Sequence, residues 1–239
     1  MKTRDLFLEE IENNWKTLGY TSKPDKFMAL TYDDGPSDFT EDLLKILKEK
    51  NVKATFFVIG NNVNQRPVVT RRIRDEGHEL ANHSQGHPSM GELPIDDSVS
   101  QIESCNEAIY LATNADGKPV KPVLFRPPNL SKGENLFSAC VKMGFPLIEG
   151  TLSYDYVRGH NSGSGEAQAN AILDNADNWN IALNHDPRSG KPEEILKAVS
   201  LMIDGLRAKG FYLLTVSELI TLSGVNAEPG KVYQDFKKP

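Results

Sequence analysis

The chain has 239 residues, of which 38% are hydrophobic and 25% are charged, and this is the composition of an ordinary globular domain. The formal net charge of -6 argues against nucleic acid and anionic membranes as partners, because both bind clustered Lys and Arg. The longest apolar runs have the length of strands, so no membrane-spanning segment is expected. A neutral substrate is compatible with this charge, and the oligomeric state is left open.

The N-terminal residues 1–12 lack the unbroken apolar core and the small-residue cleavage site of a secretory signal. The chain is therefore expected to be cytoplasmic, or to be a mature or trimmed form of a secreted protein. The two cysteines, Cys105 and Cys140, lie in helix-like segments and lack the spacing of a metal site. We expect both to be buried apolar residues, with a disulfide as the alternative.

Strand-like and helix-like segments alternate along the chain after a first helix predicted at 4–18. The apolar, strand-like runs are 27–32, 53–59, 79–82, 122–126, 146–149, 180–185 and 211–215. The amphipathic, helix-like stretches between them are 38–50, 63–76, 95–113, 131–144, 165–177 and 192–209. This alternation predicts βαβ units and a parallel sheet. The number of repeats favours a closed or nearly closed barrel, with an open doubly wound sheet as the alternative.

Polar residues follow five of the predicted strands. They are Asp33 and Asp34 after the first strand, His83 and His87 after the third, Arg126 after the fourth, Asp155 beyond the fifth, and His185 with Asp186 after the sixth. The C-terminal ends of the strands of a parallel βα barrel meet on one face. We therefore expect these side chains to lie close together, at the place where such barrels carry their active sites.

Two of these segments offer ligands for a metal ion. A carboxylate from Asp33-Asp34-Gly35-Pro36 and the two imidazoles of His83-Ser84-Gln85-Gly86-His87 make a three-ligand set for a catalytic divalent ion with an open position. The second carboxylate is then free to act as a base on water activated by the ion. The combination predicts metal-assisted hydrolysis. Taken alone, the first segment is also ordinary turn chemistry, and the histidines could lie in a polar surface loop.

Four segments match family motifs in order: Thr31-Tyr32-Asp33-Asp34-Gly35-Pro36, His83-Ser84-Gln85-Gly86-His87, Arg126-Pro127-Pro128-Asn129 and Ile181-Ala182-Leu183-Asn184-His185. In these the sequence resembles the polysaccharide deacetylases of the NodB-homology type, also called carbohydrate esterase family 4. It departs from the family at Asn129, where an aromatic residue is usual. Leu152-Ser153-Tyr154-Asp155-Tyr156 also keeps only the second acid and an aromatic of a further motif. The segments 125–130 and 222–225 resemble the bacterial acetylxylan esterases of this family more than its chitin deacetylases.

The resemblance implies a fold, an activity and a cofactor. The implied fold is an α/β, distorted (β/α) barrel of about seven parallel strands, with an N-terminal helical extension at 1–25 and a catalytic domain at 26–239. The implied activity is hydrolysis of acetyl groups on a polysaccharide or oligosaccharide. The O-acetyl groups of xylan are favoured, and the N-acetyl groups of chitin-type or peptidoglycan glycans are alternatives. The implied cofactor is one divalent ion, with zinc first and cobalt, nickel or manganese as alternatives.

The resemblance also implies a role for each matching residue. Asp34, His83 and His87 match the metal ligands. The residues that match catalytic groups are Asp33 as general base with Arg126 as its orienting partner, and His185 as general acid with Asp155 as its partner. The candidate substrate contacts are Leu183 near the acetyl methyl group, Asn129 through its N–H, and Tyr156, with Tyr154 and Trp179 as further residues that could stack on a sugar. His78 and His160 are interpreted as structural or surface residues, and Phe56 and Phe57 as core.

Three other functions fit parts of the sequence less well. A serine esterase needs a nucleophile in a Gly-x-Ser-x-Gly turn, and the sequence has no such pentapeptide. A catalytically silent carbohydrate-binding module on the same scaffold is expected to lack a metal ligand, Asp33 or His185, and all of these are present. A glycosidase using Asp33 and Asp34 is disfavoured, because adjacent residues cannot readily flank a sugar bond at a separation of about 5 Å or more.

Overall fold

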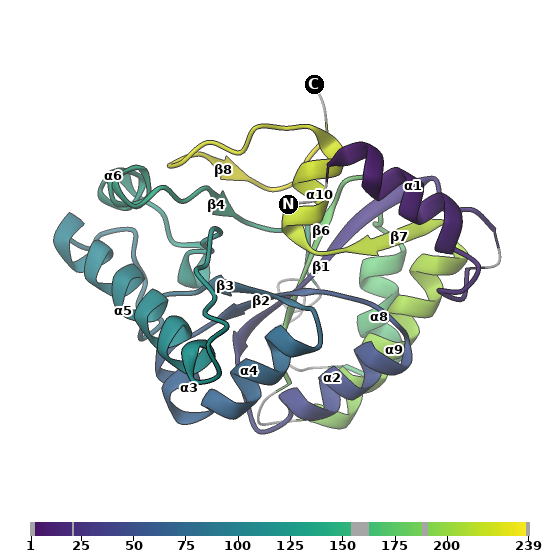
Figure 1. Ribbon diagram of the computed structural model, residues 1–239, viewed down its shortest axis with the longest axis horizontal. Coiled ribbons are helices and arrows are strands. Elements are labelled where there is room, and N and C mark those ends of the chain that lie inside the picture. The colour runs from purple at the N-terminus through teal and green to yellow at the C-terminus, as the bar shows by residue number, and fades with distance from the viewer. Residues whose placement is uncertain (1–2, 21, 154–162, 188–190, 238–239) are drawn as a thin grey trace.

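The computed structural model describes residues 3–20, 22–153, 163–187 and 191–237. Strands and helices alternate through most of the chain (Figure 1). The elements are α1 (Arg4–Asn14), β1 (Lys26–Gly35), α2 (Thr40–Glu49), β2 (Thr55–Val58), α3 (Gly60–Gln65), α4 (Pro67–Asp75), β3 (Glu79–Asn82), α5 (Ile95–Asn114), the 3-10 turn η1 (Pro128–Leu130), α6 (Glu134–Met143), β4 (Leu147–Ile148), β5 (Leu152–Ser153), α8 (Gly165–Leu173), β6 (Ile181–His185), α9 (Pro192–Ala208), β7 (Phe211–Leu214), α10 (Val216–Ser223) and β8 (Val232–Tyr233). None of the helices within these ranges combines the length and the apolar content that crossing a bilayer requires.

The sheet is built around the long strand β1. This strand pairs in parallel with β2, β6 and β7, while β3 continues the sheet beyond β2 and β5 continues it beyond β6. The parallel pair β4 and β8 joins the sheet through Phe125, which bridges Asn82 on one side and Leu147 on the other. The strands thus curve into a distorted barrel, which confirms the predicted fold class, and the open-sheet alternative is wrong.

Apolar side chains fill both faces of the strands. Met28, Leu30 and Tyr32 of β1 pack in the cluster between the strands and the outer helices, whereas Ala29 belongs to the cluster on the other face. This alternation is the two-residue period of a strand. Figure 1 shows α3, α4 and α5 beside β2 and β3, and α2, α8 and α9 beside β1 and β6. Phe56, Phe57, Cys105 and Cys140 are buried and both cysteines are free, as predicted.

The helix α1 packs beside α10, near the C-terminal end of the chain (Figure 1). Its side chains Phe7 and Ile11 are buried, and Arg4 Nε donates a hydrogen bond to Leu222 O at 3.0 Å. Tyr20, which follows the helix, stacks on Tyr212 of β7 with ring centroids 5.5 Å apart. These contacts attach the segment before β1 to the barrel. The division of the chain at residue 25 stays a prediction.

The predicted strand 122–126 is wrong. Only Phe125 makes a bridge there, although the segment occupies the place of a strand between β3 and β4. Pro122 and Pro127 lack the N–H that a ladder needs, so the apolar pattern cannot become a regular strand. Arg126 N still donates to Asn82 O at 3.0 Å. The segment is therefore held firmly enough to place the Arg126 side chain.

Two further differences concern helices and short strands. The stretch 63–76, predicted as one helix, is divided into α3 and α4 at Arg66, because Pro67 disfavours helical geometry in the residue before it. The prediction also missed β5, β8 and α10. The helix α10 has a local signal, since Thr215 and Glu218 form a capping box at its start. The two-residue strands have none, because tertiary pairing alone defines them.

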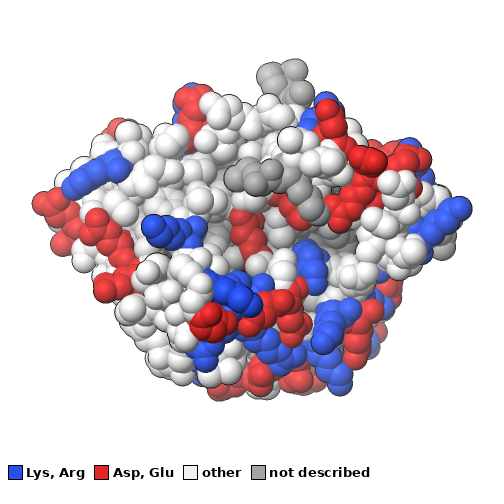
Figure 2. Space-filling model, in the orientation of Figure 1, with Lys and Arg blue, Asp and Glu red and all other residues white. Residues whose placement is uncertain are grey.

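On the face shown in Figure 2, Lys and Arg are interspersed with Asp and Glu, and acidic residues gather over α1. Among the residues described there, no broad basic patch of the kind that nucleic acid attracts is visible. The absence of a nucleic-acid or membrane partner stays a prediction.

Candidate active site

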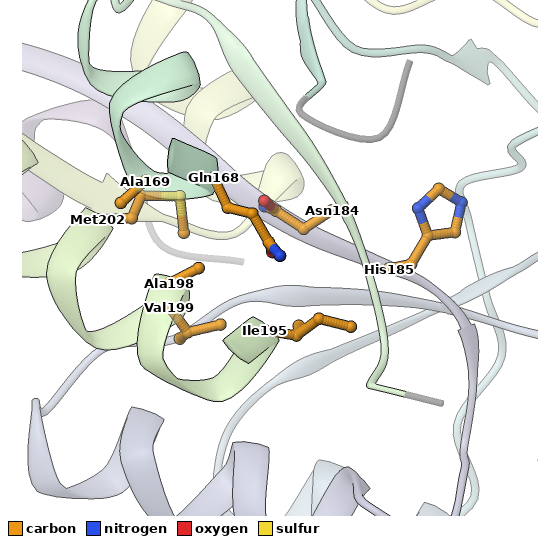
Figure 3. Close-up of a pocket in the computed structure, with 8 residues that line it drawn as sticks. All are labelled: Gln168, Ala169, Asn184, His185, Ile195, Ala198, Val199 and Met202. Carbon is orange, nitrogen blue, oxygen red and sulfur yellow. The ribbon is translucent and has the colours of Figure 1, made fainter. Parts of the chain in front are cut away.

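The ends of β1 and β6 bring two of the predicted catalytic residues to one level of the barrel. Asp33 and His185 are paired positions in the parallel register of these strands. Successive side chains of a strand point to opposite faces. Figure 3 shows this for β6: the Asn184 side chain points toward Gln168 among the outer helices, whereas the His185 ring lies on the other side of the strand. His185 therefore shares the inner side with Asp33.

Asp34, His83 and His87 form a compact set of donor atoms. The Nε2 atoms of His83 and His87 lie 3.3 and 3.1 Å from Asp34 Oδ1, and one ligand atom of each residue lies within 4.8 Å of the others. Two ligands bound to one ion in tetrahedral geometry are separated by roughly 3.3 Å. The spacing and the chemistry of the donors thus fit a divalent ion, and the three residues form a candidate metal site.

A backbone carbonyl orients the ring of His83. Its Nδ1 donates a hydrogen bond to Arg126 O at 2.7 Å, which leaves the lone pair of Nε2 directed toward Asp34. Histidines that bind metals are usually held through the other ring nitrogen in this way. The His83 side chain is buried, whereas 27% of the His87 side chain is exposed. The donor set is therefore open to solvent on the side of His87.

Two of the three candidate ligands have strained backbone. Asp34 has φ 70° and His87 has φ 59°, a left-handed conformation that is uncommon for residues other than glycine. Such strain is concentrated at functional sites, where the surrounding structure maintains it. Burial by itself raises the pKa of Asp34, but the neighbouring imidazoles of His83 and His87 outweigh burial and hold that pKa far below its usual range.

Arg126 holds the carboxylate of Asp33 in place. Its Nη1 lies 2.6 Å from Asp33 Oδ1, and both side chains are almost completely buried. The guanidinium also donates hydrogen bonds to Thr31 Oγ1 at 2.8 Å, Ile148 O at 2.9 Å and Glu149 O at 2.9 Å. Burial lowers the pKa of Arg126, whereas the neighbouring Asp33 raises it. Charge-assisted bonds of this length are strong, so the orientation of Asp33 is fixed.

Asp186 is a buried carboxylate at this site to which sequence analysis assigned no role. It accepts hydrogen bonds from Ser37 Oγ at 2.6 Å and Thr40 Oγ1 at 2.8 Å, and its N–H donates to Asp33 O at 2.8 Å. Burial raises its pKa to about 6, against the lowering effect of the two hydroxyls. Asp186 thus ties the turn after β1 to the end of β6. The available signal was an acid immediately after His185 at a strand end.

Gly35 allows this close approach of the two segments. A Cβ atom at Gly35 would lie 2.6 Å from Asp186 Oδ2, a distance that real Cβ contacts do not show. Any larger residue would push the turn that carries Asp34 away from β6. The requirement for glycine at this position is therefore steric and concerns the geometry of the site.

Glu149 is a second buried acid near the site, and the sequence did not indicate its position there. Its carboxylate forms an ion pair with Lys132 and accepts a hydrogen bond from Gln234 Nε2 at 2.8 Å. Its backbone carbonyl is the acceptor for Arg126 Nη2. Glu149 therefore connects the loop after η1 and the C-terminal segment to the residue that holds Asp33. No local pattern indicates this role, because its partners are distant in sequence.

The predicted substrate contacts differ in their burial, and some of them lie outside the described residues. Leu183 is buried on β6 and lies two residues before His185, so both side chains face the same side. Asn129 is exposed in η1 with φ 56°, and its Nδ2 donates to Ser89 Oγ at 3.2 Å. The predicted residues that lie outside the described part of the chain are Tyr154, Asp155, Tyr156 and His160.

The prediction that Trp179 stacks on a sugar at this site is wrong. Trp179 precedes β6, so it lies at the end of the strand opposite His185. Its ring packs against Phe27 with centroids 5.1 Å apart, as part of the apolar cluster there. The other histidine interpreted as structural, His78, is buried as a structural residue would be.

A parallel βα barrel with a candidate three-ligand metal site at the C-terminal ends of its strands is typical of a hydrolase. The sequence profile of one family, described as polysaccharide deacetylase, matches residues 20–148. The chain belongs to the polysaccharide deacetylase family, and the resemblance seen in its motifs is confirmed.

Relatives of known type match most of the chain. It is 35% identical over 216 residues to a bifunctional xylanase/deacetylase of Pseudobutyrivibrio xylanivorans, a match that covers 90% of this chain and 34% of that protein. It is 32% identical over 203 residues to a chitin deacetylase of Colletotrichum lindemuthianum, covering 81% of this chain and 79% of that protein. The chain thus spans about a third of the first relative and most of the second.

A solved structure is similar over nearly its whole length. A family 4 acetyl xylan esterase from Clostridium thermocellum, in complex with a cobalt ion, superimposes with a TM-score of 0.79 at 31% identity. The match covers 88% of this chain and 98% of that chain. This likeness supports the fold described above.

Proposed function

We propose that this protein is a metal-dependent deacetylase that removes acetyl groups from a polysaccharide or oligosaccharide, with the O-acetyl groups of xylan as the preferred substrate. One observation carries the proposal: the ligand atoms of Asp34, His83 and His87 lie within 4.8 Å of one another, next to the buried carboxylate of Asp33. The named activities of the xylanase/deacetylase and of the acetyl xylan esterase support xylan, and the chitin deacetylase keeps N-acetyl groups as the alternative.

Asp34, His83 and His87 would hold the ion. Zinc is the first candidate, and cobalt, nickel or manganese are alternatives, because a site of one carboxylate and two imidazoles accepts several divalent metals. The cobalt ion in the similar esterase structure supports this range. A divalent ion held there would polarise the acetyl carbonyl and would lower the pKa of bound water, to about 7 in favourable zinc sites.

Asp33 is proposed as the general base. It takes a proton from the water that attacks the acetyl carbon, and Arg126 keeps its carboxylate aimed through the 2.6 Å bond. Asn129 is proposed to donate its N–H to the developing oxyanion. Leu183 and Tyr156 are proposed to contact the acetyl methyl group and the sugar. The resemblance to the family supports all of these roles, and the hydrogen bond to Arg126 supports the role of Asp33 in addition.

His185 is proposed as the general acid. Its Nε2 lies 3.9 Å from Asp34 Oδ2, so the ring is at the edge of the donor set. From there it can give a proton to the oxygen or nitrogen of the sugar as the acetyl group leaves. Asp155 is proposed to stabilise the charged form of this histidine and to orient it.

The test is metal removal followed by acetate measurement. The protein is treated with a chelator and dialysed, and acetate release from acetylated xylan and from chitin oligomers is measured before and after zinc or cobalt is returned. We expect activity to disappear and to be restored, with xylan cleaved faster than chitin. Undiminished acetate release after complete metal removal would overturn the proposal. Oligosaccharide binding with no acetate release under any condition would favour a catalytically silent module.

A further inference from the structure

A hollow of about 250 Å³ lies next to the candidate active site, between the turn after β1 and α3. Its lining includes Asp34, so it begins at the residue that belongs to the candidate metal site. We propose that this hollow is a subsite for an uncharged sugar unit that neighbours the acetylated one. This inference rests on the proposed function, since it assumes that the acetyl group is held at the donor set.

The lining has the chemistry that a sugar ring needs. Phe39 and Ile59 offer apolar surface, and Asn62, Gln65 and Arg66 offer planar polar groups around it. A sugar presents C–H faces that pack on an aromatic ring and hydroxyls that both donate and accept hydrogen bonds. Ligand sites usually combine apolar walls with a few placed polar groups in this manner. The hollow therefore suits a single hydroxylated ring better than a purely apolar group.

Two of the polar side chains are held in position by the protein. Arg66 Nη2 and Nε contact Asp38 Oδ1 at 2.6 and 3.1 Å, while Asn62 Nδ2 donates to Asp34 O at 2.8 Å. The Asp38 side chain is 79% exposed, so it remains accessible to a ligand while it holds Arg66. Side chains that are already ordered lose less entropy when a ligand binds. The subsite is therefore formed before the sugar arrives.

The charge of the hollow selects an uncharged ligand. Among the described residues of the lining, the one cation is Arg66, which is paired with Asp38, while Asp34 belongs to the candidate metal site. A phosphate or an acidic sugar would have to compete with Asp38 for Arg66 and would lie against the exposed Asp38 carboxylate, and like-charge contacts oppose binding. Neutral xylose or N-acetylglucosamine units do not meet this penalty. The hollow thus favours neutral stretches of a glycan next to the acetylated unit.

The first test compares a substrate that reaches the hollow with one that does not. For each variant, kcat/KM for acetate release is measured on acetylated xylohexaose and on the monosaccharide xylose tetraacetate. In the wild type we expect the hexaose to be preferred. In Phe39→Leu and in Arg66→Ala the ratio of the two values should fall by on the order of tenfold, which is the effect of losing one packing contact in a pocket. The matched control is Arg72→Ala, which removes ion pairs with Glu41 and Glu76 outside the hollow and should keep the ratio.

The second test does not require turnover. Wild type and variants are titrated calorimetrically with xylohexaose and, separately, with chitohexaose, both uncharged chains. Weaker binding by Phe39→Leu and Arg66→Ala, but not by Arg72→Ala, of whichever chain the wild type binds would support the subsite. Unchanged ratios and unchanged affinities in both variants would overturn it, as would a wild type that binds neither chain. If acetate release fails while the variants still lose binding, the proposed activity falls and the sugar subsite stands.

Discussion

Arg126 joins two parts of the candidate active site through opposite ends of the same residue. Its Nη1 lies 2.6 Å from Asp33 Oδ1, and its backbone oxygen accepts the hydrogen bond from His83 Nδ1 at 2.7 Å. The proposed base and a proposed metal ligand are thus positioned by one side chain and one carbonyl of a segment between two prolines. Because the segment cannot form a regular strand, its hydrogen-bonding groups remain available for these contacts.

Replacing Asp33 by Asn should reduce acetate turnover and leave metal binding intact. The amide keeps the shape of the carboxylate but cannot take the proton, and general-base catalysis contributes about 10²–10⁴-fold. We expect kcat to fall by that order, with unchanged metal content measured by atomic absorption after dialysis. The exposed Asp42→Asn on α2 serves as the control. Full activity of the Asp33 variant would remove Asp33 from the role of base.

Replacing Arg126 by Ala should destabilise the fold as well as reduce activity. The change leaves the Asp33 carboxylate buried without its partner, and breaking a buried pair in this way lowers stability by about 3–5 kcal/mol. Urea unfolding followed by circular dichroism measures the effect. Arg72→Ala removes two partly exposed ion pairs, with Glu41 and Glu76, and should lower the free energy of unfolding by less than about 2 kcal/mol, since such pairs contribute about 0–1 kcal/mol each. Equal losses in the two variants would contradict a special role for the buried pair.

Replacing His87 by Ala should weaken metal binding, whereas replacing His185 by Ala should not. His87 belongs to the donor set, but His185 Nε2 lies 3.9 Å from Asp34 Oδ2 and is proposed to move a proton. Loss of an outer partner of a ligand already lowers metal affinity roughly 10–100-fold, so loss of a ligand should exceed that. Equilibrium dialysis with zinc measures both variants. Equal metal content in His87→Ala and wild type would refute the ligand assignment.

The convergence of the candidate ligands could be predicted because the alternation of apolar runs along the sequence indicates both the order of the strands and where each strand ends. Asp34, His83 and His87 each follow an apolar run, and parallel strands bring such positions together. The same rule excludes Trp179 from the site. It also adjoins a strand, but at the beginning of β6, and only the direction of the strand separates that end from the site.

The roles of Asp186 and Glu149 could not be predicted, although the position of Asp186 at a strand end was. Asp186 is bound by Ser37 and Thr40, and Glu149 by Lys132 and Gln234, so their importance depends on contacts between distant segments. Sequence periodicity indicates which face of a strand or helix a residue occupies, but it does not indicate which polar group from another segment will contact that residue. Buried acids are satisfied by tertiary partners, and these are visible only once the barrel is closed.

Lowering the pH should destabilise the protein through His78. This residue directly precedes β3, at the end of the strand opposite the candidate ligand His83. His78 is buried, and its Nδ1 accepts a hydrogen bond from Ala54 N at 3.2 Å. Burial, with a smaller effect from Lys53, lowers the pKa of His78 from 6.5 to about 3. The unfolded chain therefore takes up a proton near pH 6.5, whereas the folded chain does so only near pH 3. Between these values acid favours the unfolded state.

The contribution of His78 to stability is thus complete above pH 6.5 and is lost as the pH falls toward 3, with a slope of up to about 1.4 kcal/mol per pH unit. His78→Asn keeps an acceptor for Ala54 N and removes the titrating ring. We expect wild type to lose stability relative to this variant as the pH is lowered from 6.5 to 3.5, measured by urea unfolding at several pH values. Parallel pH profiles for the two proteins would show that His78 is not kept neutral by the fold.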